Sequence, residues 1–390
     1  MQYNFDEIVD RSNTDCVKLE KMKALFGRDD LIPLWVADMD FKSPPAISRA
    51  LEERVAHGIY GYTLPSEAYT NSIVGWLSRH HRWQVDPGHI NFVPGVVKGF
   101  AFAIDEFTEK GDKVIIQPPV YHPFRIVTRS LEREVVNNPL ILEEGQYRMD
   151  FKGLREILSK ERCKMLILCN PHNPGGRIWS AGELKELAEI CHAHDVLVVS
   201  DEIHSDMALG SHRHIPFATV SPEAEAISLT LMAPSKTFNI AGIVSSFAVI
   251  PNKEIRERYL AYLEPRELQQ GTLFAFAATR AAYEECDNWL RQMLDYVEEN
   301  IRFVDEFLRE HIPVIEAMIP EASFLVWLDC RQLGLSQRDL VSLFVDKAGL
   351  ALNDGTMFGS EGQGFMRLNV GTSRLILEKA LNNLKNAMSH

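Results

Sequence analysis

Apolar and polar positions follow one regular pattern through the middle of the chain. Between about residues 90 and 250, short apolar runs alternate with stretches of helical period. The apolar runs are Ile90–Gly95, Lys113–Pro119, Lys164–Pro171, Val196–Glu202, Ala226–Met232 and Ile243–Ile250. Most of them are continuously apolar, as strands are when both of their faces are buried. The pattern therefore predicts an α/β domain with a mostly parallel central sheet flanked by helices on both faces.

The C-terminal part of the chain has a different pattern. From Cys286 to His311, apolar residues recur at spacings of three and four, which predicts one long amphipathic helix. Beyond it, Ser323–Cys330 and Gly364–Gly371 have the pattern of strands in a smaller α+β unit. We therefore expect a large domain over residues 46–287, and a small domain formed by residues 1–45 together with residues 288–390.

Composition and charge exclude some classes of partner. The 390 residues carry a formal net charge of −13 without any basic run, so nucleic acid is not an expected partner. The N-terminal residues are acidic where a secretory signal is basic, and no apolar run approaches the length of a membrane span. We therefore expect a cytoplasmic protein that does not enter a membrane. No metal site is expected either, because the six cysteines form no CxxC pair and the histidines do not recur at ligand spacing.

Polar residues follow four of the apolar runs directly. They are an acid, Asp201, an amide, Asn173, an aromatic ring, Tyr121, and an amine, Lys236. In an open parallel sheet, ligands bind beyond the carboxyl ends of the strands, so these four groups are expected to meet in one crevice. Together they match the needs of pyridoxal 5'-phosphate: an amine for its aldehyde, a carboxylate for its ring nitrogen, a donor for its phenolic oxygen and a ring to stack on its face.

The motifs that contain these residues resemble those of a known enzyme superfamily. The segments NPHNPGG (Asn170–Gly176), SDEIH (Ser200–His204) and SKTFN (Ser235–Asn239) occur in this order, as they do in the class I/II aminotransferase superfamily. WVADMDF (Trp35–Phe41) and HGIYGY (His57–Tyr62) are most similar to its MalY/PatB-type cystathionine β-lyases. The resemblance spans essentially the whole chain and implies the aspartate aminotransferase-like fold of pyridoxal-phosphate-dependent transferases.

The resemblance also implies a role for each matching residue. Lys236 would bond covalently to the cofactor and act as the catalytic base, and Asp201 would bind the pyridine nitrogen. The other implied cofactor contacts are Asn173, Tyr121, His204, Gly95, Val96, Val97 and Ser235, the last four around the phosphate. Arg367 would bind the substrate α-carboxylate, with Asn173 and Ala37 beside it. Tyr62 would reach the cofactor of a neighbouring subunit, which implies a homodimer with shared active sites.

Three positions depart from the pattern of aminotransferases. Val244 stands where those enzymes have a phosphate-binding arginine, His204 where they have a tyrosine, and Ala233 where many have a serine. The first two differences are similar to the lyase branch. His204 could also be a buried histidine with a purely structural role.

We therefore expect β-elimination from an amino-acid substrate, in which L-cystathionine or a related cysteine thioether yields a thiol such as homocysteine, pyruvate and ammonia. Cystathionine, cystine, S-alkylcysteines and cysteine all remain candidate substrates. One alternative is an aminotransferase that acts on an L-amino acid with the same cofactor. A second is a regulatory or binding protein built on this fold.

Overall fold

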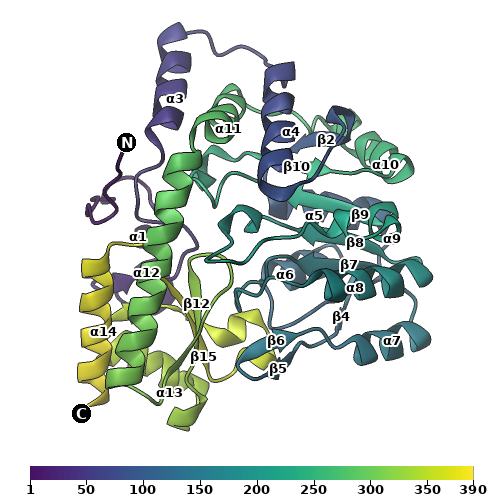
Figure 1. Cartoon of the computed structure of the whole chain (residues 1–390). Coiled ribbons are helices and arrows are strands. Elements are labelled where there is room, and N and C mark those ends of the chain that lie inside the picture. The colour runs from purple at the N-terminus through teal and green to yellow at the C-terminus, as the bar shows by residue number, and fades with distance from the viewer. Residues whose placement is uncertain (390) are drawn as a thin grey trace.

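The computed structural model describes residues 1–389 and contains one large seven-stranded sheet (Figure 1). Its strands, in spatial order, are β2 (Ile90–Val93), β10 (Ser246–Val249), β9 (Ser228–Met232), β8 (Leu197–Asp201), β7 (Cys163–Cys169), β3 (Lys113–Ile116) and β4 (Glu134–Asn137). Among them, only β10 runs against the others, since it pairs antiparallel with both β2 and β9. The predicted, mostly parallel sheet is confirmed, and each predicted apolar run overlaps a strand. The sequence pattern missed β4, a half-exposed edge strand without a continuous apolar run.

Helices cover both faces of this sheet. α5 (Val96–Phe107), α6 (Pro123–Ser130) and α10 (Lys253–Leu263) share one hydrophobic cluster with it, and α7 (Phe151–Lys160), α8 (Ala181–Ala193) and α9 (Pro222–Ala226) share another. Successive residues of β7 alternate between these clusters: Leu166 and Leu168 lie in that of α8, and Met165 and Ile167 in that of α5. A strand whose side chains alternate between two covered faces has to be apolar throughout, which explains the continuous runs.

The start of α8 shows how local sequence sets a helix boundary. The Ser180 hydroxyl accepts a hydrogen bond from the N–H of Glu183, and the Glu183 carboxylate accepts one from the N–H of Ser180. This capping box satisfies two backbone donors that the first turn of a helix leaves free.

A second group of helices lies beyond the β2 edge of the sheet. It consists of α3 (Pro45–His57), α4 (Glu67–His81) and α11 (Leu273–Glu285), and α11 packs on both α3 and α4. From there α12 (Asp287–His311) runs toward the C-terminal helix α14 (Arg374–Met388), against which it packs (Figure 1). Its 25 residues confirm the long helix that the apolar spacing predicts.

The C-terminal region forms a four-stranded antiparallel sheet. Its order is β11 (Glu316–Met318), β12 (Leu325–Asp329), β15 (Phe365–Asn369) and β14 (Asn353–Asp354), with α13 (Gln337–Ser342) in a connection. The N-terminal part contributes α1 (Val17–Glu20), α2 (Met22–Phe26) and β1 (Ile32–Pro33), and β1 pairs with β13 (Leu350–Ala351). A separate hairpin consists of β5 (Ile141–Glu143) and β6 (Gln146–Arg148).

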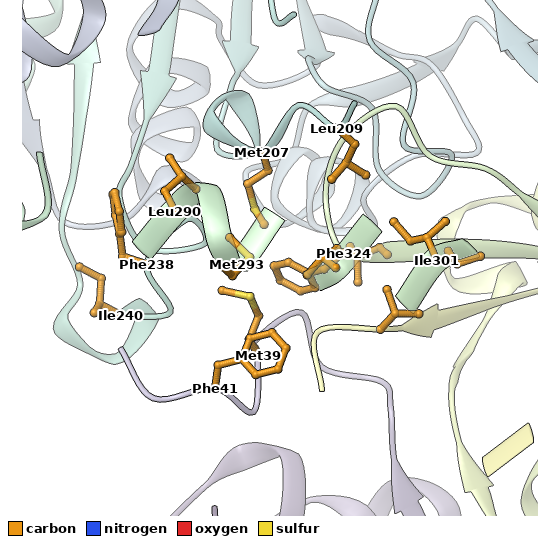
Figure 2. Packing of buried hydrophobic residues seen from close by; sticks show 14 of the residues in the cluster. Met39, Phe41, Met207, Leu209, Phe238, Ile240, Leu290, Met293, Ile301 and Phe324 are labelled. Carbon is orange, nitrogen blue, oxygen red and sulfur yellow. The ribbon is translucent and has the colours of Figure 1, made fainter. Parts of the chain in front are cut away.

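The largest hydrophobic cluster connects these parts (Figure 2). Met293 of α12 lies at its centre, with Met39 and Phe41 from an irregular N-terminal segment on one side. Phe238 and Ile240, which closely follow Lys236, belong to the same cluster. The cluster therefore packs the N-terminal segment and the loop that carries Lys236 against one long helix. Within residues 1–389, no helix is both long enough and apolar enough to cross a bilayer.

Candidate active site

A cavity of about 330 Å³ opens beyond the carboxyl ends of β7, β8 and β9, beside the start of α5. Most of the residues singled out from the sequence line it: Ala37, Gly95, Val96, Val97, Tyr121, Asn173, Asp201, His204, Ser235 and Lys236. They come from six separate segments of the chain: five lie at the carboxyl ends of parallel strands of the large sheet, and the sixth is the N-terminal segment that contains Ala37. Arg367 borders the cavity through its hydrogen bond to Asn173, whereas Tyr62 lies away from it.

The Lys236 amine is held in a defined position. Lys236 follows β9 by four residues, and its Nζ donates a 2.6 Å hydrogen bond to the carbonyl oxygen of Ala37. Burial lowers the pKa of the amine to about 8, although the negative charges of Asp38 and Asp201 favour its charged form. A substantial fraction of this amine is therefore neutral near physiological pH, as a nucleophile or a base requires.

Asp201 ends β8 on the floor of the cavity and is 4% exposed. Its Oδ1 accepts one hydrogen bond, from the N–H of Ile203, at 3.1 Å. Burial raises the pKa of this carboxyl to about 7. A buried carboxyl with so few donors fits a ligand that presents a protonated ring nitrogen, which would complete its hydrogen bonds and stabilise its charge.

Arg367 on β15 is a buried cation without an acidic partner among residues 1–389. Its Nη1 donates to Asn173 Oδ1 at 3.1 Å, and its Nη2 donates to Trp35 O at 2.9 Å and to Asn353 Oδ1 at 2.6 Å. Its Nε has no partner, and burial lowers the pKa of the guanidinium to about 10. An uncompensated buried guanidinium fits an anionic ligand, and its planar fork matches a carboxylate.

The start of α5 supplies the free backbone donors of the site. Gly95 is its N-cap with a φ of 113°, a conformation that glycine adopts without strain. A Cβ at this position would meet no protein atom within 4 Å, so the cavity is open here. Because the first N–H groups of a helix have no partner within it, those of Val96 and Val97 can bind a phosphate. Ser235 adds a hydroxyl to the lining of the same cavity.

Tyr121 and His204 line the same cavity as neutral groups. Burial raises the pKa of the Tyr121 phenol to about 12, with a further contribution from Asp201. Burial lowers the pKa of His204 to about 3, and the nearby cations Lys236 and Arg367 lower it further. The Nδ1 of His204 is buried without a hydrogen-bond partner.

Tyr62 has a different environment from the other predicted site residues. It lies in the connection between α3 and α4 with a fully exposed side chain, and it does not line the cavity of its own chain. The resemblance implies that Tyr62 reaches the cofactor of a neighbouring subunit, and this role stays a prediction. Val244 and Ala233, the two apolar departures from the aminotransferase pattern, both line the cavity.

Sequence reasoning missed several contacts that support the site, although it singled out Ala37 itself. Asn353 binds Arg367, and the carbonyls of Trp35 and Ala37 accept from the two cations. Cys169 also lines the cavity, where its Sγ accepts from the N–H of Asn173 at 3.3 Å. Trp35 and Ala37 belong to the segment WVADMDF, but the sequence cannot show that their carbonyls are acceptors, because every residue type has the same main-chain carbonyl. Asn353 lies in the two-residue strand β14, which pairs with β15, and no sequence signal marks it.

Comparisons with known proteins agree with this geometry. The family described as aminotransferase class I and II matches residues 29–384. Cystathionine beta-lyase PatB of Bacillus subtilis is 44% identical, covering 99% of this chain and 100% of that protein. Protein MalY of Escherichia coli is 32% identical, covering 99% of both. The PLP-bound C-S lyase from Staphylococcus hominis superposes with a TM-score of 0.93 at 33% identity, covering 100% of this chain and 99% of that one. The fold, the residues that line the cavity and these relatives together show that the chain belongs to the aminotransferase class I and II family, in the branch that contains PatB and MalY.

Proposed function

We propose that this protein is a pyridoxal-phosphate-dependent carbon–sulfur β-lyase that cleaves L-cystathionine or a related cysteine thioether to a thiol, pyruvate and ammonia. One observation carries the proposal. The amine of Lys236, with a pKa lowered to about 8, and the buried carboxyl of Asp201 line one cavity beside Arg367, a cation without an acidic partner in the described residues. The relatives named cystathionine beta-lyase and C-S lyase support elimination as the chemistry.

The residues of the cavity fit the cofactor. We assign Lys236 to its aldehyde, Asp201 to its ring nitrogen, Asn173 to its phenolic oxygen and Tyr121 to its ring face. Gly95, Val96, Val97 and Ser235 surround the place for its phosphate, and His204 offers an unpartnered Nδ1 beside Asp201. When bound, the cofactor supplies an electron sink for the charge that develops at the substrate α-carbon.

The chain's own residues then account for orientation and proton transfer. Arg367 binds the α-carboxylate in a bidentate pair, with Asn173 and Ala37 beside it, which fixes the α-carbon near Lys236. The neutral amine of Lys236 takes the α-proton, the β-carbon–sulfur bond breaks, and its electron pair leaves on sulfur, which takes up a proton to become the thiol. Addition of water to the remaining carbon skeleton releases pyruvate and ammonia.

The assembly and the domain division belong to the same proposal. We infer a homodimer in which Tyr62 completes the phosphate site of the other subunit, and its exposed side chain in a single chain supports this. We also propose a large and a small domain with boundaries near residues 46 and 287. The pairing of β1 with β13 supports this division, because it joins the N-terminal segment to the C-terminal region. The cytoplasmic location expected from the sequence stays a prediction.

A product assay separates this proposal from its alternative. The purified protein is incubated with L-cystathionine, and pyruvate and free thiol are measured without any keto acid present. A parallel reaction contains an L-amino acid and 2-oxoglutarate, and glutamate is measured. Pyruvate and thiol in equal amounts in the first reaction support the lyase. Glutamate formation without pyruvate release from any thioether would establish an aminotransferase instead.

A further inference from the structure

The segment Trp35–Phe41, called the strap below, lies between the two cationic groups of the site. Lys236 Nζ donates to Ala37 O at 2.6 Å, and Arg367 Nη2 donates to Trp35 O at 2.9 Å. The strap has no strand or helix of its own. It is therefore held in place by contacts with other segments, which include the hydrogen bond from the N–H of Asp40 to the carbonyl of Gly371 at 2.8 Å, and the position of its carbonyls decides where the amine and the guanidinium lie.

Two asparagines and two apolar side chains hold the strap toward the core. Asn239 forms hydrogen bonds with the N–H and the carbonyl of Met39, at 3.0 and 2.9 Å. Asn369 Nδ2 donates to the carbonyls of Val36 and Asp38, at 2.6 and 2.7 Å. Met39 and Phe41 are 1% and 5% exposed and pack near Met293 of α12 (Figure 2).

The acidic side chains of the strap are held by two cations from the N-terminal residues. Lys18 Nζ on α1 lies 2.8 Å from Asp40 Oδ1 and 3.2 Å from Asp38 Oδ1, and it also donates to the carbonyl of Asp38. Arg11 pairs with the same two carboxylates, at 2.7 and 3.0 Å. Lys18 is only 2% exposed, whereas the Arg11 side chain is 27% exposed. Because Lys18 is shielded from solvent, its charge interactions are stronger than those of Arg11.

The strap also brings charge to the site. Asp38 is next to Ala37 and favours the charged form of Lys236, while its own pKa is lowered, against the effect of burial, by Arg11 and Lys18. If the pairing to Lys18 is lost, Asp38 and Asp40 keep one partially exposed cation between them. Both carboxylates then gain by turning toward solvent, which draws the Ala37 carbonyl with them.

We propose that Lys18 is a positioning residue for the reaction: by binding Asp38 and Asp40 it holds the strap at the depth where the carbonyls of Ala37 and Trp35 orient Lys236 and Arg367. Lys18 itself touches neither group. The inference concerns a buried ion pair outside the cavity, and only its turnover assay rests on the proposed lyase activity.

The test replaces Lys18 by methionine, which has a similar length but no charge, in the full-length protein loaded with cofactor. We expect Lys18→Met to lower kcat/KM for thioether cleavage by about 10- to 100-fold, as a displacement of catalytic groups by a fraction of an ångström to one ångström does. KM rises because Arg367 is displaced, and kcat falls because Lys236 is displaced. Rates are divided by the concentration of bound cofactor, which is measured by its visible absorption. A smaller fraction of folded or cofactor-loaded protein therefore does not lower the reported rate.

Two further variants separate positioning from general stability. Lys42→Met removes an exposed ion pair with Glu7 directly beside the strap and should leave kcat and KM within about twofold of the parent. Asn369→Ala loosens the strap from its other side. Because both residues act through the strap, the double variant Lys18→Met/Asn369→Ala should lose less than the product of the two single losses.

A binding measurement keeps the inference independent of the lyase assignment. L-Alanine has the α-carboxylate and the amine but no leaving group, and its binding is followed by the change in cofactor absorption. Lys18→Met should weaken L-alanine binding by about tenfold or more even if the parent protein releases no pyruvate. Parental kcat and KM, or parental L-alanine binding, in folded and loaded Lys18→Met would overturn the inference. If that variant does not fold, Asp40→Asn, which removes one carboxylate contact of Lys18, takes its place with the same readouts.

Discussion

The Nη1 of Arg367 donates to the Oδ1 of Asn173 at 3.1 Å, although 194 residues separate the two in the chain. This hydrogen bond joins the end of β7 in the large sheet to β15 in the small one. In the proposed assignment, Asn173 contacts the bound cofactor as well as Arg367, so this one amide would orient substrate and cofactor relative to each other.

Replacing Arg367 by lysine should lower kcat/KM for thioether cleavage by about 100-fold, because an ammonium cannot form the bidentate pair. Most of the loss should fall on KM, since the carboxylate is bound in both the ground state and the transition state. Kinetics of pyruvate release check this. The exposed Arg331, which pairs with Asp329 on the surface, is the matched control, and Arg331→Lys should change kcat/KM by less than twofold, about the noise of the assay. Equal effects of the two variants would contradict the assignment of Arg367.

Lys236→Ala should abolish turnover and the visible absorption that a cofactor bonded to the protein produces, because the other lysine that lines the cavity, Lys98, is exposed to solvent on α5. The absorption spectrum of the purified protein and pyruvate release from cystathionine are the measurements. Lys98, at the cavity mouth on α5, is the control: Lys98→Ala should keep both signals. Pyruvate release at the parental rate from Lys236→Ala would disprove its role.

Recombination of cofactor-free protein with pyridoxal 5'-phosphate should speed up as pH rises, because only the neutral amine of Lys236 attacks the aldehyde. With a lowered pKa of about 8, the rate should increase by about 10- to 30-fold from pH 6.5 to 8.5 and then level off. An amine with the ordinary pKa of 10.5 would instead keep accelerating through pH 9. Stopped-flow absorption records the rate. Asp201→Asn is the control that shows whether Asp201, whose pKa is raised to about 7, contributes to the same pH range.

Co-expression of Lys236→Ala with Tyr62→Ala should restore activity that neither variant has alone, if the active site is shared. Random mixing gives heterodimers in which one site has both wild-type residues, so about a quarter of the parental activity is expected. Kinetics of the purified mixture, with each homodimer as control, give the measurement. Activity no higher than the mean of the two homodimers would show that Tyr62 acts within its own chain or not at all.

Asp206→Ala should destabilise the protein by about 2–4 kcal/mol, because three donors lose a buried carboxylate. Trp76 Nε1, His81 Nε2 and Thr237 Oγ1 approach it at 2.8, 2.7 and 3.1 Å, and Thr237 follows Lys236. Although burial raises it, the pKa of Asp206 is lowered overall by the hydrogen bond and charge of His81. Its contribution is therefore present above the ordinary carboxyl pKa and is lost as pH falls through the lowered value.

Denaturant unfolding of the parent and the variant at neutral and acidic pH measures this difference. Glu257→Gln, in an exposed pair with Lys253 on α10, is the matched control and should stay within about 0.5 kcal/mol of the parent. An Asp206→Ala protein as stable as this control would mean that the buried network contributes no net stability.

The sequence by itself determined the strands of the central sheet and the group of residues at their carboxyl ends. Strands covered on both faces have to be apolar throughout, so β3, β7, β8 and β9 are visible as continuous runs. Because Lys236, Asp201 and Asn173 follow such runs directly, their meeting in one cavity follows from the parallel order of the strands. The half-exposed edge strand β4 has no such run, and local patterns did not find it.

Only the tertiary structure decided how those groups are oriented. The acceptors of Lys236 and Arg367 are main-chain carbonyls of Ala37 and Trp35, and every residue type offers the same carbonyl. Asn353 acts because strand pairing in the small sheet places it opposite Arg367. Lys18 acts through the packing of α1 against the strap, and no motif marks either residue. Residue types mark where chemistry can occur, whereas the positions of backbone acceptors and buried ion pairs are fixed by packing alone.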